Sequence, residues 1–178
     1  MTRSTVAELT LPVGERDHAQ GSEDAPVTLL EYGDYECSYC GQAYPIVKEV
    51  QDELGDDLRF VFRNFPLEEM HPHARRAAEA AEAAGTQGEF WAMHDYLYEH
   101  QDALDDDHLT EYAAEVGLDV DRFEQALEEE SHEERIQEDF LSGARSGVSG
   151  TPTFFIDGER YEGRWSVELL TAALRKRL

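Results

Sequence analysis

The feature that most constrains this chain is a pair of cysteines placed shortly after an apolar run. Residues 27–32 (Val-Thr-Leu-Leu-Glu-Tyr) have the length and the branched and aromatic content of a buried strand. Cys37 and Cys40 follow after a short loop, at the start of a helical pattern. A strand, a short loop and a Cys-x-x-Cys that begins a helix form the layout of a dithiol redox site.

The two thiols are expected to differ because of their positions on the helix. A helix N-terminus has free N–H groups and a partial positive charge, and both stabilise a thiolate at Cys37. The thiolate is the reactive form of cysteine. Cys40, one turn later on the same face, can attack the mixed disulfide that Cys37 forms. We therefore expect Cys37 to be the exposed, attacking thiol and Cys40 to be the resolving thiol.

Two other interpretations of the cysteine pair stay open: a structural bridge between the two residues, and half of a zinc site. The chain has only 2 cysteines, so a scaffold of several disulfides is excluded by count. A zinc site needs about four ligands. His71 and His73, which flank Pro72, would have to complete it without a second cysteine pair. The pair is more typical of a redox centre that needs no metal and no organic cofactor.

The net charge of the chain argues against some classes of partner and indicates an environment of high salt. The formal net charge is -25, from 40 acidic and 15 basic residues, and the only lysines are Lys48 and Lys176. Phosphate contacts need a basic surface, so nucleic acid and anionic membranes are not expected partners. Strong acidity with few lysines resembles the composition of proteins from halophilic archaea. In roughly 1 M salt the Debye length falls to about 3 Å, which screens such self-repulsion.

The start of the chain and its length bound the location and the number of domains. No run approaches the ~18 apolar residues of a membrane span. Residues 1–20 mix charged side chains with few apolar ones and lack the apolar segment of a signal peptide. We therefore expect a cytoplasmic protein, unless a leader has been removed. With 178 residues, the chain is expected to form one domain, or one domain carrying a large insertion.

Hydrophobic periodicity places a group of helices between two groups of strands. The first half is expected to contain a flexible polar arm with a short edge strand near 16–20, a strand at 27–32, a helix at 37–54 that Pro45 kinks, and a strand at 58–65. The second half is expected to contain helices at 72–84, 90–101, 108–116 and 120–129, a helix that starts at a capping box over 131–134, strands at 153–156 and 160–161, and a last helix at 166–177.

This order of elements resembles the thioredoxin fold with the helical insertion of the DsbA-like thiol-disulfide oxidoreductases. Tyr35-Glu-Cys-Ser-Tyr-Cys40 is similar to the active-site segment of that family. Residues 149–158 (Ser-Gly-Thr-Pro-Thr-Phe-Phe-Ile-Asp-Gly) resemble its cis-proline loop and hairpin. Glu31 stands six residues before Cys37, where the superfamily often has a buried acid.

The resemblance covers about residues 22–178 and implies an α/β fold with a definite domain organisation. The expected parts are a polar N-terminal arm (1–21), a thioredoxin-like domain (22–65 and 148–178), and a helical insertion (66–147) between the parallel strand unit and the C-terminal hairpin. The dipeptide Ser38-Tyr39 differs from the Pro-His of the strongly oxidising founding member.

The resemblance also implies roles for residues around the cysteines. A buried Glu31 near Cys40 would hold a proton and relay it when Cys40 becomes a thiolate; the alternative is a strand edge that faces solvent. A cis bond before Pro152 would turn the backbone of Thr151 toward the cysteines, where an extended substrate could pair with it. The alternative is an ordinary trans proline at the start of a strand. Ser38 and Tyr39 would contact the substrate.

We therefore expect a thiol-disulfide oxidoreductase that acts on protein thiols or disulfides with an unidentified redox partner, and we favour a monomer. The direction of electron flow depends on the reduction potential relative to the compartment and stays open. One alternative is a thioredoxin-fold metal-binding chaperone that holds a soft metal such as Cu(I) with both thiolates. Another is a glutathione-dependent transferase or isomerase on the same fold, which would not require Cys40.

Overall fold

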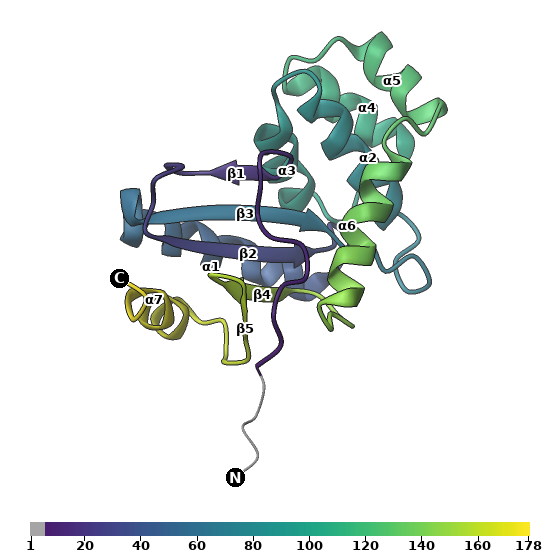
Figure 1. Ribbon diagram of the computed structural model, residues 1–178. Coiled ribbons are helices and arrows are strands. Elements are labelled where there is room, and N and C mark those ends of the chain that lie inside the picture. The colour runs from purple at the N-terminus through teal and green to yellow at the C-terminus, as the bar shows by residue number, and fades with distance from the viewer. Residues whose placement is uncertain (1–5) are drawn as a thin grey trace.

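The computed structural model describes residues 6–178 and contains a five-stranded mixed sheet with helices on both faces (Figure 1). The strand order is β1-β3-β2-β4-β5, with β2 and β3 parallel and the other neighbours antiparallel. The strands are β1 (His18–Gln20), β2 (Val27–Gly33), β3 (Leu58–Asn64), β4 (Thr153–Ile156) and β5 (Glu159–Tyr161). The α/β class expected from the sequence is confirmed.

The burial of the central strand, β2, accounts for its apolar sequence. β2 lies between β3 and β4 in the sheet, and its side chains join apolar clusters on both faces, so every residue in it except Thr28 is buried. A strand that is covered on both faces reads as a continuous apolar run instead of an alternating pattern. A carboxylic acid within this run, Glu31, is therefore carried into the interior.

The helix after β2 carries the cysteines at its start. α1 (Ser38–Leu54) begins one residue later than predicted, because Cys37 has extended backbone angles and occupies the N-cap position. The helix continues through Pro45. Its buried stripe, Cys40, Ala43, Val47, Val50 and Leu54, joins one large apolar core with β2, β3 and the C-terminal helix α7 (Val167–Arg175). In Figure 1, α1 passes behind the sheet.

All five helices of the predicted insertion lie between β3 and β4, and their ends differ from the predicted ones by at most two residues. They are α2 (Ala74–Gly85), α3 (Phe90–Glu99), α4 (Asp106–Glu115), α5 (Val120–Glu128) and α6 (Glu133–Arg145). In Figure 1, α4 and α5 lie far from the sheet, whereas α6 runs back past one end of the strands.

The capping box predicted at Ser131 is wrong. His132 occupies the N-cap of α6, and its side chain makes no capping hydrogen bond. Two acidic residues in the first turn, Glu133 and Glu134, lie where the helix field favours negative charge, which provides another way to stabilise this end.

Where the structure describes it, the polar arm lies against the sheet; residues 1–5 lie outside the described part. The N–H of Leu9 donates to the carbonyl of Gly158 at 2.8 Å. The guanidinium of Arg63, which is fully buried in β3, binds both carboxylate oxygens of Asp17 at 2.8 and 2.9 Å. A buried guanidinium needs such partners because an unpaired charge in the interior is costly. The arm therefore packs against the sheet because the buried Arg63 of β3 needs the carboxylate of Asp17.

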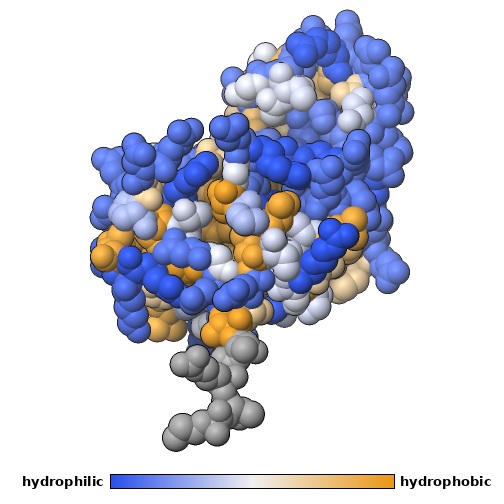
Figure 2. Space-filling view, viewed as in Figure 1, coloured by the Kyte–Doolittle hydropathy of each residue, from blue (hydrophilic) through white to orange (hydrophobic). Residues whose placement is uncertain are grey.

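The arm and α6 cover one face of the sheet only in part. A second apolar cluster lies on this face, and its buried members are Leu30, Tyr32, Val61, Phe65, Val148 and Phe155. Figure 2 shows apolar side chains reaching the surface between polar ones on the side of the sheet turned to the viewer. The cysteines belong to the other, larger cluster, together with α1.

Candidate active site

The two cysteines lie where the chain passes from β2 into α1. Both are free thiols. The N–H of Cys37 donates to the carbonyl of Asp34 at 3.2 Å, which closes a tight turn before the helix. Cys40 is completely buried, and Cys37 is also buried, with only 5% of its surface exposed. The prediction of an exposed Cys37 is therefore wrong. The physical reason is the neighbouring loop, since the Cys37 Sγ lies 3.6 Å from the carbonyl oxygen of Thr151.

The electrostatic surroundings of Cys37 favour its thiolate. The pKa of Cys37 is lowered to about 5, chiefly by the hydrogen bond from the Cys40 thiol, against an opposing effect of burial. Thr151 and the N–H groups of Tyr39 and Cys40 lower the pKa further. The N–H groups are the free donors of the first helical turn, which is the effect expected from the position of the cysteine.

Cys40 is shifted in the opposite direction. Burial raises the pKa of Cys40 well above its ordinary value, the hydrogen bond to Cys37 raises it further, and so do Glu31 and Cys37 when they are ionised. The pair therefore consists of one thiol that ionises easily and one that holds its proton, about one helical turn apart.

Glu31 is buried and does not face solvent, which were the two alternatives that the sequence left open. It is 2% exposed, and its Oε1 has no hydrogen-bond partner among residues 6–178. Burial, with a smaller effect from the charge of Cys37, raises its pKa to about 8. Glu31 is thus protonated near neutral pH, which is the state that a proton donor needs. Its role as a relay stays a prediction.

The other predicted residues surround Cys37. The peptide bond between Thr151 and Pro152 is cis, as predicted, and both residues are half-buried. Ser38 is exposed and Tyr39 is 61% exposed, so the two residues between the cysteines face solvent. The role of these four residues in binding substrate stays a prediction.

Sequence reasoning missed a buried carboxylate that organises the turn. Asp34 is 2% exposed and accepts hydrogen bonds from the N–H groups of Glu36 (2.8 Å) and Leu67 (2.9 Å) and from Nδ1 of His71 (2.8 Å). Burial opposes the charged form of His71, but Asp34 and the nearby Cys37 raise its pKa overall. No local pattern pointed to the contacts with Leu67 and His71, because these residues lie 33 and 37 positions after Asp34.

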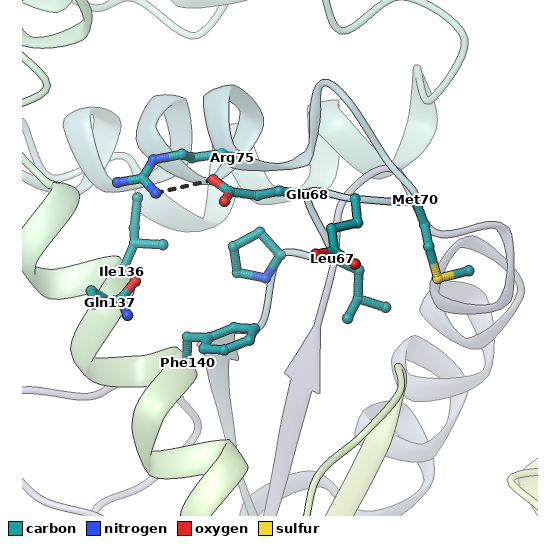
Figure 3. Close-up of a pocket in the computed structure, with 9 residues that line it drawn as sticks. Leu67, Glu68, Met70, Arg75, Ile136, Gln137 and Phe140 are labelled. Atoms are coloured by element: carbon teal, nitrogen blue, oxygen red, sulfur yellow. Dashed lines mark hydrogen bonds and ion pairs between the residues drawn. The ribbon is translucent and has the colours of Figure 1, made fainter.

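The loop that Asp34 holds also forms a wall of an apolar cavity of about 370 Å³ (Figure 3). Figure 3 shows side chains of α6, including Phe140, on one side and Leu67 and Met70 of the loop on the other. An ion pair between Glu68 and Arg75, 3.0 Å long, lies at the rim. Met70 is 71% exposed. Through Leu67 and its bond to Asp34, the cavity adjoins the turn that carries Cys37.

The histidines considered for a zinc site have other partners. His71 pairs with Asp34, and His73 pairs with Glu36 at 2.9 Å. Within the described range no group of three or more His, Cys, Asp or Glu side chains is placed to hold a metal ion. None of the helices described here is long and apolar enough to cross a membrane.

A Cys-x-x-Cys that begins a helix after the central strand, next to a cis-proline peptide, defines a dithiol protein of thioredoxin fold. The chain belongs to the thioredoxin family, whose model matches residues 14–176.

Solved structures give the same fold. A thioredoxin-like oxidoreductase from Silicibacter pomeroyi superposes with a TM-score of 0.81 at 26% identity, covering 92% of each chain. BdbD from Bacillus subtilis in its oxidised form superposes with a TM-score of 0.85 at 22% identity, covering 97% of this chain and 98% of BdbD. Because the identity to BdbD is this low, the superposition supports the shared fold only.

A curated relative is a much longer protein. The chain is 48% identical over 170 residues to the Na(+)/H(+) antiporter NhaA 1 of Salinispora arenicola. This match covers 95% of the chain but only 26% of the antiporter. The chain thus spans about a quarter of the length of the relative that it matches.

Proposed function

We propose that the protein is a thiol-disulfide oxidoreductase that exchanges disulfides with protein substrates through Cys37 and Cys40. The observation that carries this proposal is the placement of Cys37 at the N-cap of α1 beside the cis Thr151–Pro152 peptide, with Cys40 buried one turn later. In these surroundings the pKa of Cys37 is lowered to about 5 and the pKa of Cys40 is raised well above its ordinary value. A structural bridge would not need this asymmetry. Disulfide exchange does, because the attacking and leaving sulfur must be a stable thiolate.

The reaction consists of two successive thiol-disulfide exchanges. A substrate thiolate attacks Cys37 in the Cys37–Cys40 disulfide, which forms a mixed disulfide and releases Cys40 as a thiolate that takes up one proton. A second substrate thiolate then attacks the substrate sulfur of the mixed disulfide and releases Cys37 as a thiolate. Two electrons pass from the substrate to the cysteine pair. The reverse sequence, started by the Cys37 thiolate, reduces a substrate disulfide.

Glu31 supplies the proton that Cys40 needs. Its carboxyl group is buried near this thiol, and its pKa is raised to about 8, so it holds a proton near neutral pH. A protonated acid can donate to the leaving thiolate and recover the proton when Cys40 attacks in the reverse direction. The backbone of Thr151, next to the Cys37 sulfur, is the edge along which an extended substrate segment would pair.

Trapping of the mixed disulfide tests the proposal. Cys40→Ser removes the resolving thiol, so incubation with a reduced-and-reoxidised protein mixture is expected to leave covalent adducts on Cys37 that dithiothreitol releases. Cys37→Ser is the matched control and is expected to form almost none. Adducts through Cys40 alone, or none with either variant, would contradict the assigned roles. Full turnover by Cys40→Ser with glutathione would favour the glutathione-dependent alternative.

The antiporter relative supports a proposal about the partner. Because nearly the whole chain matches part of a Na(+)/H(+) antiporter, we propose a membrane transport protein as one substrate of the dithiol, in the same polypeptide or in another. Co-expression of the Cys40→Ser variant with the Salinispora arenicola antiporter is expected to give a reducible adduct of the two. Absence of this adduct, with adducts to other proteins present, would reject this partner only.

Three predictions about the setting of the protein stay untested. The origin in a halophilic archaeon is a prediction from the acidic, lysine-poor sequence. The cytoplasmic location and the monomeric state also stay predictions. The metal-binding alternative stays testable by metal analysis of the reduced protein, since two thiolates suit a soft metal.

A further inference from the structure

Gln101 connects the helical insertion to the backbone around Cys37. It follows α3 by two residues and is half-buried. Its Nε2 donates to the carbonyl of Tyr35 at 2.8 Å and to the carbonyl of Cys37 at 2.9 Å. The Cys37 carbonyl also accepts the first helical hydrogen bond of α1, from the N–H of Gly41 at 3.0 Å. One amide group therefore holds the backbone on both sides of the attacking thiol.

The glycine at position 41 is what leaves room for this amide. A Cβ atom at Gly41 would lie 2.1 Å from Oε1 of Gln101 and 2.7 Å from its Cδ. Gly41 lies inside α1, where glycine is less favourable than alanine, and its φ is not in the left-handed region. The backbone conformation does not require a glycine here, so the space occupied by Gln101 is the physical reason for it.

We propose that Gln101 is a positioning residue that sets the redox properties of Cys37 from the helical insertion. This inference rests on the proposed oxidoreductase function. By holding the carbonyls of Tyr35 and Cys37, Gln101 keeps the turn in the geometry that presents the N–H groups of Tyr39 and Cys40 to the Cys37 sulfur.

Hydrogen bonds to sulfur weaken steeply with misalignment, so a small displacement of the turn matters. Without Gln101 the thiolate of Cys37 is held less well, which destabilises the reduced form relative to the disulfide. The protein then becomes a weaker oxidant. The alkylation of Cys37 moves toward higher pH at the same time, because both properties depend on the same thiolate.

Four variants test this role in the full chain. Gln101→Ala removes the side chain, and Gln101→Glu keeps its shape but cannot donate. Gly41→Ala keeps Gln101 in the sequence but fills the space that its amide group occupies. Gln51→Ala is the matched control, because it removes another glutamine bond of α1, from Nε2 of Gln51 to Oε1 of Gln20 at 2.9 Å, at the opposite end of the helix.

The measurements are the redox equilibrium against a glutathione buffer, the pH midpoint of Cys37 alkylation and the thermal midpoint. Both Gln101 variants are expected to shift the redox equilibrium toward the disulfide by about tenfold. This is about the effect of losing one hydrogen bond to the Cys37 thiolate, and it equals about 30 mV for a two-electron couple. The alkylation midpoint is expected to rise above its value near pH 5. Gly41→Ala is expected to shift both in the same direction without lowering the thermal midpoint, because alanine favours the helix.

The double variant Gly41→Ala with Gln101→Ala distinguishes a shared cause from two separate ones. If Gly41 acts by admitting Gln101, the double variant shifts the equilibrium no further than Gln101→Ala alone. Additive shifts would overturn this link. If Gln101→Ala and Gln51→Ala both keep the redox equilibrium of the wild-type protein, the positioning role of Gln101 is overturned. Failure of the wild-type protein itself to equilibrate with glutathione would instead reject the proposed function.

Discussion

Replacement of Glu31 by glutamine separates stability from catalysis at this site. Burial raises the pKa of Glu31 from 4.5 to about 8. A tenfold change in an ionisation constant corresponds to about 1.4 kcal/mol. Below the unfolded pKa both states are protonated and the acid carries no ionisation penalty. As the pH rises toward the folded pKa, the unfolded chain ionises first, so the wild-type protein loses stability through this window.

The expected size of the effect follows from the two pKa values. Between about pH 4.5 and pH 7 the wild-type protein should lose roughly 3 kcal/mol of unfolding free energy relative to Glu31→Gln, which cannot ionise. The change with pH is the quantity to compare, because any fixed difference in packing or desolvation between an acid and an amide cancels. Oxidised protein should show a smaller effect of the same sign, since burial is the main cause and the charge of Cys37 is then absent.

The assay is urea unfolding of reduced and oxidised protein across this pH range at one high salt concentration, with exchange rates measured in parallel. Glu31→Gln is expected to be the more stable protein near neutral pH and yet the slower catalyst, because Cys40 lacks its proton donor. Stability curves of wild type and variant that stay parallel with pH would show that Glu31 ionises normally. An unchanged pH profile of exchange would refute the relay.

Three further predictions concern charge, thiol reactivity and packing. Thermal unfolding in about 3 M KCl should occur at a higher temperature than in about 0.1 M, because salt screens the net charge of -25; equal midpoints would remove the halophilic interpretation. Iodoacetamide should modify Cys37 at half its maximal rate near pH 5, and Cys40 only far above that pH; equal reactivity would contradict the asymmetry. Gly143→Ala should cost about 1–3 kcal/mol in urea unfolding, because the new Cβ would lie 2.8 Å from the ring of Phe65. Gly150→Ala, where no atom lies within 4 Å, is its control, and equal losses would refute the packing argument.

Local patterns in the sequence were sufficient for the elements and for the centre of the site. Apolar periodicity predicted the central strands and the helices of the insertion to within two residues, because each pattern reports which face of a short segment is buried. The position of Cys37 at a helix start predicted that its thiolate is stabilised, since the free N–H groups of the first turn belong to the same segment.

Other features could not be predicted because their partners are distant in the chain. Asp34 binds His71 from the loop after β3, and its neighbours in sequence give no sign of this contact. The first residues looked like a free polar arm, but the buried Arg63 binds Asp17 and so draws the arm onto the sheet. Cys37 was expected to be exposed, because its own segment contains nothing that covers it.

By itself the sequence determined the order of elements of the thioredoxin fold, the position of the cysteine pair and the thiol that lies at the helix start, because these depend on residues within a few turns of one another. Only the tertiary structure decided what surrounds that sulfur. Thr151 and Gln101 reach the Cys37 segment from other parts of the fold, at 3.6 Å and 2.9 Å respectively. The physical reason is that hydrogen bonds and burial depend on which atoms meet in space, and the packing of the whole chain decides that.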